Sequence, residues 1–133
     1  MNVLLDTNIF LEIILAQERA PEARNLIEKI EDHEFFITDY SLHSIGLLLF
    51  RLGRHQSFQE FLADIMVRAG TSLIFLLVED MASVIQAAQQ FHLDFDDAYQ
   101  YAAAAKNNLT LVSFDSDFDR TDHGRKTPTE IIV

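Results

Sequence analysis

Three aspartates that are far apart in the sequence are candidates for binding a metal ion: Asp6, Asp97 and Asp115. Carboxylates gathered in one place repel one another, which raises the pKa of at least one of them, and a bound divalent cation removes that cost. Oxygen ligands suit Mg²⁺ or Mn²⁺. An ion of this kind activates a bound water and stabilises the charge on a phosphodiester under attack, so hydrolysis of phosphodiesters is the chemistry to consider first.

The sequence around the three aspartates predicts that they meet. Asp6 directly follows the apolar run Val3-Leu4-Leu5, and Asp115 lies two residues beyond a second such run that ends at Ser113. In a parallel sheet the carboxyl ends of the strands share one edge, where ligands bind. Asp97 begins a helix rich in alanine, and this lack of side-chain bulk allows the helix to pack close to the sheet.

Each aspartate also has a purely structural explanation. Asp6 could cap the following helix, Asp97 could interact with a helix dipole, and Asp115 could shape a turn. Their joint placement at one edge favours the metal site. Three further acids lie beside them in the sequence: Asp94, Asp96 and Asp117.

The chain alternates short apolar runs with longer segments of helical period, which predicts an α/β protein with a mostly parallel sheet flanked by helices. We expect strands at Asn2–Leu5, Glu34–Ile37, Leu73–Val78 and Thr110–Ser113, and an edge strand at Glu130–Val133. We expect helices at Asn8–Ala16, Pro21–Ile30, Ser41–Leu52, Phe58–Ala69, Met81–Phe91 and Asp96–Asn107.

Length and composition predict one domain over residues 1–133. The chain has no cysteine, which excludes a disulfide scaffold and a thiolate metal site, and no apolar run long enough to span a membrane. We therefore expect a cytoplasmic protein. The net charge of −11 disfavours binding to a nucleic acid. Cations bound among several aspartates would reverse the sign locally.

Three segments resemble the PIN domain family, which includes the VapC-type toxin ribonucleases. They are Leu4 to Phe10 (LLDTNIF), Asp97-Ala98 with Ala102 and Ala104, and Leu111 to Phe118 (LVSFDSDF). The segments occur in the family's order and extend over most of the chain. The resemblance implies a three-layer α/β/α fold with a central sheet of four or five strands.

The resemblance also implies roles for individual residues. Asp6, Asp97 and Asp115 would be metal ligands and catalytic residues, and Asp117 an accessory acidic ligand. Asn8 and Ser113 would orient these ligands. Asp96 is the alternative to Asp97 as the acid that starts the helix, although the alanine spacing favours Asp97.

The chain departs from the family pattern at one position. The family places a glutamate six residues beyond a Ser or Thr at the end of the second strand, and counting from Thr38 leads to Ser44. Asp39, Glu12 or the neighbouring His43 would have to supply the missing ligand, and none has the expected spacing. The hypothesis is a weakened site that holds one ion well and a second poorly.

The leading prediction is a ribonuclease dependent on Mg²⁺ or Mn²⁺ that hydrolyses RNA phosphodiester bonds, with a candidate role as the toxin of a toxin-antitoxin pair and an antitoxin protein as partner. The alternative is a catalytically impaired PIN-fold module for binding or regulation, in which Leu47 to Phe50 forms an interface with a partner or a second copy. A phosphatase or receiver-like domain is a third candidate, but no second acid stands beside Asp6.

Overall fold

The computed structural model describes residues 1–29 and 31–132 of the chain. Four strands form one sheet in the order β3-β2-β1-β4, and every neighbouring pair is parallel. The strands are β1 (Asn2–Leu5), β2 (Glu34–Thr38), β3 (Ser72–Ile74) and β4 (Thr110–Val112). The two inner strands, β1 and β2, therefore end at the same edge of the sheet as β4.

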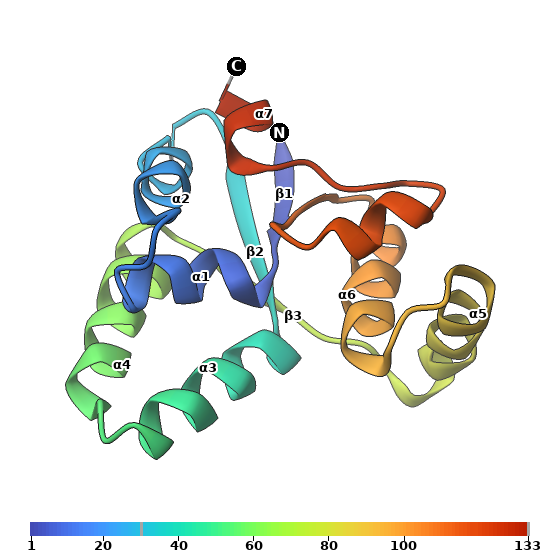
Figure 1. The fold of residues 1–133 in the computed structure, drawn as a ribbon, viewed down its shortest axis with the longest axis horizontal. Coiled ribbons are helices and arrows are strands. Elements are labelled where there is room, and N and C mark those ends of the chain that lie inside the picture. Colours follow the sequence, from blue (N-terminus) through green and yellow to red (C-terminus); the bar gives the residue numbers. More distant parts are fainter. Residues whose placement is uncertain (30, 133) are drawn as a thin grey trace.

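Helices cover both faces of the sheet, with α1, α2 and α4 on one side and α5 and α6 on the other (Figure 1). The α-helices are α1 (Thr7–Ile14), α2 (Ala20–Ile27), α3 (Asp39–Arg51), α4 (His55–Phe61), α5 (Met81–Phe91), α6 (Phe95–Lys106) and α7 (Pro128–Ile132). Three shorter helical segments are the π-helix η1 (Leu62–Arg68) and the 3₁₀-helices η2 (Val78–Asp80) and η3 (Ser116–Arg120).

The side chains of β1 alternate between two hydrophobic cores, as the pleat of a strand requires. Val3 and Leu5 belong to the core formed with α1, α2 and the α3–η1 region, whereas Leu4 belongs to the core formed with α5 and α6. Both faces of the sheet are thus covered at β1, which explains why Val3, Leu4 and Leu5 are apolar without alternation. The predicted three-layer α/β/α fold with a parallel sheet is confirmed.

The predicted edge strand at Glu130–Val133 is wrong: Pro128–Ile132 is the helix α7, and Val133 lies outside the described residues. The residues from Thr127 to Glu130 favour the start of a helix instead of a strand. The Glu130 carboxylate accepts a hydrogen bond from the backbone N–H of Thr127 at 2.9 Å, as in a capping box, and Pro128 suits the first helical position.

The predicted strand Leu73–Val78 is too long, because β3 pairs only through Ser72–Ile74. Its last partner is Thr38, after which the chain of β2 turns into α3. Beyond that point the sheet offers no backbone partner, and the N–H of Leu76 donates instead to the Tyr99 hydroxyl at 3.0 Å.

The predicted helices all exist. Met81–Phe91 has the predicted bounds, and the ends of the others are shifted. The second helix was expected to extend to Ile30, which lies outside the described residues. The segment expected at Phe58–Ala69 begins earlier, at His55, and changes from α-helix to π-helix at Leu62. Within residues 1–29 and 31–132, no helix has the length and apolar character needed to cross a bilayer.

Candidate metal site

Asp6 lies at the end of β1 and is 6% exposed. It precedes α1 as its N-cap, with Oδ1 accepting from the N–H of Thr7 at 2.9 Å. Oδ1 also accepts from Gln100 Nε2 at 2.9 Å, and Oδ2 accepts from Ser113 Oγ at 2.7 Å and from Asn8 Nδ2 at 3.4 Å. Asp6 therefore caps α1 as expected, and the capping bond is one of four hydrogen bonds that its carboxylate accepts.

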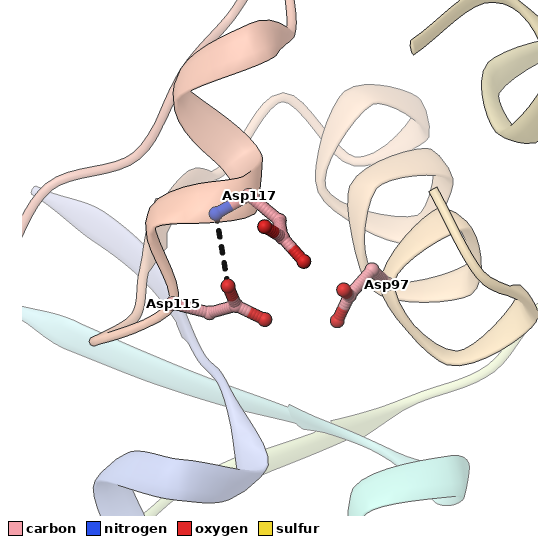
Figure 2. Close-up of side chains that lie close together, drawn as sticks. All are labelled: Asp97, Asp115 and Asp117. Carbon is pink, nitrogen blue, oxygen red and sulfur yellow. Dashed lines mark hydrogen bonds between the residues drawn. The ribbon is translucent and has the colours of Figure 1, made fainter. Parts of the chain in front are cut away.

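Three other aspartates form a compact cluster next to Asp6. Asp97, Asp115 and Asp117 each offer a carboxylate oxygen, and these three oxygens lie within 4.8 Å of one another. Figure 2 shows the three side chains pointing toward one another, with Asp97 on α6 and the other two at the start of η3. The N–H of Asp117 donates to Asp115 Oδ1 at 2.9 Å, which fixes the turn that brings both acids to the cluster.

The acids interact electrostatically. Burial, followed by the charges of Asp115, Asp94 and Asp6, raises the pKa of Asp97 to about 7. Burial also raises the pKa of Asp6, while hydrogen bonds from Gln100 and Ser113 oppose that rise. Since the cluster disfavours its own full ionisation, a divalent cation bound among these carboxylates would relieve the repulsion.

The acids line one open cavity of about 310 Å³. Asp6 shares this cavity with the cluster, although its oxygens are not part of the group within 4.8 Å. The lining also includes Asp96, so both candidate acids of α6 face the cavity, but Asp97 alone of the two belongs to the cluster. The lining residues are Asp6, Thr7, Asn8, Leu11, Tyr40, Asp94, Asp96, Asp97, Gln100, Asp115 and Asp117.

Asn8 and Ser113 connect Asp6 to the cluster. Ser113 Oγ donates to Asp6 and accepts from the N–H of Asp115 at 2.9 Å. Asn8 Nδ2 donates to Ser113 Oγ at 3.2 Å, and its Oδ1 accepts from the N–H of Phe114 at 3.2 Å. These contacts hold the ends of β1 and β4 in a fixed relation.

Gln100 is a buried part of the site that the sequence analysis missed. It is 1% exposed and lies three residues beyond Asp97 on α6. Residues three apart share a face of a helix, so this spacing was a signal that Gln100 faces the same cavity. Tyr40, which also lines the cavity, was missed as well. Burial raises the pKa of Tyr40. A hydrogen bond with Ser44 lowers it by a smaller amount, and Asp96 raises it.

The residues considered as replacements for the missing glutamate do not line the cavity. Asp39 accepts from the Tyr99 hydroxyl at 2.7 Å, and Glu12 accepts from the N–H of Arg19 at 2.8 Å. His43 is exposed and lines an apolar groove instead. Ser44 is also absent from the cavity lining.

One arginine lies next to the acids. Arg120 Nη1 is 3.1 Å from Asp117 Oδ1, and its other nitrogens donate to the carbonyls of Phe91 and His92 at the end of α5. These bonds hold a positive charge against one acid of the cluster, although Arg120 itself does not line the cavity.

Comparison with solved structures shows the same fold in bacterial proteins. A toxin-antitoxin complex from Klebsiella pneumoniae matches with a TM-score of 0.74 and 20% identity, covering 95% of this chain and 97% of the other. VapBC2 from Rickettsia felis, bound to a promoter DNA fragment, matches with a TM-score of 0.77 and 17% identity, covering 95% and 97%. VapC20 from Mycobacterium tuberculosis, described as a toxin that cleaves the sarcin-ricin loop, matches with a TM-score of 0.75 and 15% identity, covering 91% and 95%.

No curated protein sequence gives a significant match to the chain. The family model of the PIN domain matches residues 3–124. That range includes the acids of the cluster, Asp6, and the polar residues that connect them. The resemblance found in the three sequence segments is confirmed: the chain belongs to the PIN domain family.

Proposed function

We propose that the protein is a metal-dependent ribonuclease that hydrolyses RNA phosphodiester bonds. The observation that carries the proposal is the cluster of Asp97, Asp115 and Asp117, whose carboxylate oxygens lie within 4.8 Å of one another. Membership of the PIN domain family supports it, and one structurally similar protein, VapC20, is described as a toxin that cleaves the sarcin-ricin loop.

The donor set fits a hard divalent cation. All the candidate ligands are carboxylates, which suit Mg²⁺ or Mn²⁺ and leave coordination positions for water. When bound, such an ion supplies an activated water and neutralises charge developing on the phosphate. Asp97, Asp115 and Asp117 would hold it. The pKa of about 7 at Asp97 supports this role, because it reflects burial and repulsion between carboxylates, and a bound cation would relieve the repulsion.

The neighbouring residues would position these ligands. Asp6 would complete the set as the buried carboxylate at the base of the cavity. Asn8 and Ser113 would orient it through their hydrogen bonds. Asp96, on the rim, would add negative charge and attract the cation.

Ser44 would weaken the site. A serine has no charge to offer, and neither it nor the nearby acid Asp39 lines the cavity. The cluster would thus hold one ion well and a second one poorly. Cleavage of RNA would be slower than with a complete set of acids, because fewer positive charges would face the phosphate in the transition state.

RNA is the proposed substrate despite the net charge of −11. Arg120 beside Asp117 would supply positive charge, and a bound cation would supply more. Phosphate oxygens would interact with these groups, while the remaining acidic surface would repel the rest of the backbone. Affinity would therefore be confined to a short segment of RNA at the cavity.

Cleavage of a single-stranded RNA with Mn²⁺, with Mg²⁺ and with EDTA tests the proposal. We expect cleavage only with a divalent ion and at least a hundredfold lower rate in Asp6→Asn. Asp64→Asn is the matched control, because Asp64 is an exposed acid on η1 away from the cavity. Cleavage that survives in Asp6→Asn would indicate a contaminating nuclease. Metal binding without cleavage would instead support a binding or regulatory module.

We also propose an antitoxin-like protein as partner, bound in the apolar groove of α3 and α4. This groove has a volume of about 460 Å³ and is lined by Asp39, Leu42, His43, Gly46, Leu47, Phe50 and Phe58. Leu47 is 44% and Phe50 56% exposed, and they line one groove together with the apolar Leu42 and Phe58, which distinguishes them from apolar residues exposed singly. Solved structures with the same fold are toxin-antitoxin complexes, and the chain's negative charge favours a basic partner.

Phe50→Glu tests this interface. The partner tested is a small basic protein encoded beside the gene. We expect Phe50→Glu to bind it with at least tenfold lower affinity, whereas Val67→Glu should bind it with normal affinity. Val67 is 78% exposed on η1 and does not line the groove. The other predicted occupant of the groove is a second copy of the chain, and light scattering of the chain alone tests for it. A homodimer that becomes a monomer in Phe50→Glu would assign the groove to the second copy.

A further inference from the structure

Gln100 connects three elements beneath the acidic cavity. From α6 its side chain reaches Asp6 at the end of β1, and it also reaches Thr38 and Ser41 around the start of α3. The distances are 2.9 Å from Nε2 to Asp6 Oδ1, 2.8 Å from Nε2 to Ser41 Oγ and 2.6 Å from Thr38 Oγ1 to Oε1. All the hydrogen-bonding capacity of the Gln100 amide nitrogen is therefore used within the protein.

The neighbours of Gln100 fix the orientation of its amide. Thr38 Oγ1 accepts from the N–H of Ser41 at 3.0 Å and has one proton of its own to donate. That proton has two acceptors within reach, Gln100 Oε1 at 2.6 Å and Ser41 Oγ at 3.3 Å, and the shorter contact favours the amide oxygen. On the other side of the amide, an ionised Asp6 carboxylate can only accept, so Nε2 faces it as a donor.

The two oxygens of Asp6 differ as a result. Oδ1 accepts two hydrogen bonds of 2.9 Å, from Thr7 and Gln100, which fill both of its lone pairs. Oδ2 accepts one short bond of 2.7 Å from Ser113 and one long contact of 3.4 Å from Asn8. A weak contact at 3.4 Å is readily displaced, so Oδ2 is the oxygen with capacity left for another ligand.

We infer that Gln100 is a positioning residue that occupies Asp6 Oδ1 and directs Oδ2 toward the cation. The inference rests on the proposed metal site. Gln100 also lies three residues after Asp97 on α6, so the same contact sets the rotation of the helix that presents Asp97. One buried amide thus places two of the acids relative to each other.

Binding of Mn²⁺ by Gln100→Met tests the inference. Methionine retains the length and apolar volume of the side chain but cannot donate a hydrogen bond. We expect the dissociation constant for Mn²⁺, measured by electron paramagnetic resonance, to increase at least tenfold, as is typical when a group that orients a ligand is lost. Ser41→Ala is the matched control, because it removes another hydrogen bond of Gln100 and leaves the contact with Asp6.

The outcomes separate this inference from the proposed function. Absence of Mn²⁺ binding by the unaltered chain would overturn the proposed function. Normal binding by the unaltered chain and by folded Gln100→Met would overturn the role of Gln100 alone. Equal weakening in Gln100→Met and Ser41→Ala would assign the effect to loss of the buried network and would also overturn it.

A measurement on the unaltered chain covers the case in which Gln100→Met does not fold. In a titration with Mg²⁺ followed by NMR, we expect the side-chain amide signals of Gln100 to shift and to saturate together with the backbone signal of Asp115. Signals of Gln100 that stay constant while the site fills would contradict the inference.

Discussion

Ser113 Oγ donates a hydrogen bond of 2.7 Å to Asp6 Oδ2, across a separation of 107 residues in the chain. The same oxygen accepts from the N–H of Asp115, so one hydroxyl connects the buried acid of β1 to the acidic cluster. β1 and β4 are neighbours in the sheet, with Leu5 paired to Val112. The register of these two strands therefore sets the geometry of the site.

Replacing Ser113 by alanine is predicted to weaken metal binding. The variant loses the donor to Asp6 and the acceptor for Asp115, so both acids lose a fixed orientation. We expect the dissociation constant for Mn²⁺, measured by calorimetry, to rise about tenfold to a hundredfold. Ser116→Ala is the control, since Ser116 is exposed and does not line the cavity. Unchanged affinity in Ser113→Ala would show that the strand register alone suffices.

Replacing Asp97 by asparagine is predicted to stabilise the metal-free protein at high pH. The pKa of Asp97 is raised from 3.8 to about 7, so the folded state binds more protons than the unfolded state between these values. Stability from this group is full below about pH 4 and is lost as the pH rises through 7. In Asp97→Asn this loss is absent. Because Asp97 is only partly buried, we expect a gain of about 1 kcal/mol at pH 8, or about 4 °C in Tm.

Thermal denaturation in EDTA at pH 5 and pH 8 measures this effect. The difference between Asp97→Asn and the unaltered chain should be larger at pH 8 than at pH 5. Added Mn²⁺ should reverse the order at pH 8, because a ligand that binds the folded state stabilises it and the variant has lost a carboxylate. A variant that is less stable at pH 8 in EDTA would contradict the repulsion inferred for the cluster.

Replacing Ser44 by glutamate is predicted to strengthen the site. Ser44 does not line the cavity, but it hydrogen-bonds Tyr40, which does. The longer glutamate side chain would extend toward the acids from this position, so the affinity for Mn²⁺ and the rate of RNA cleavage should each increase by about tenfold. His43→Glu is the matched control, because it adds an acid at the neighbouring position, which faces the apolar groove. Unchanged binding and cleavage in Ser44→Glu would remove the idea of a weakened site.

The layers of the fold were predictable from the sequence because the inner strand β1 is apolar on both faces. Val3, Leu4 and Leu5 are all buried, as a parallel sheet covered by helices requires. The two wrong strand predictions concern segments whose structure depends on hydrogen bonds of the backbone. The apolar run after Ile74 has no strand to pair with, and the start of α7 depends on the hydrogen bond from the backbone N–H of Thr127 to the Glu130 carboxylate.

The site was predictable only in part. The positions of Asp6 and Asp115 after apolar runs placed them at the sheet edge, where both line the acidic cavity. Gln100 was not predicted. Its position three residues after Asp97 indicates the helix face that it shares, but a glutamine between two tyrosines does not reveal that the residue is only 1% exposed. Its partners Thr38 and Ser41 come from a different part of the chain, and only the packing of α6 against the end of β2 brings them together.

The order of the elements along the chain has a consequence for folding. Asp6 and its partner Ser113 are separated by 107 residues, and the cluster acids Asp115 and Asp117 closely follow Ser113. The acidic cavity therefore forms only when β4 pairs with β1, which closes a long loop of the chain. Contacts of such high sequence separation form slowly, so a partly folded chain lacks the cavity even where its helices are already formed.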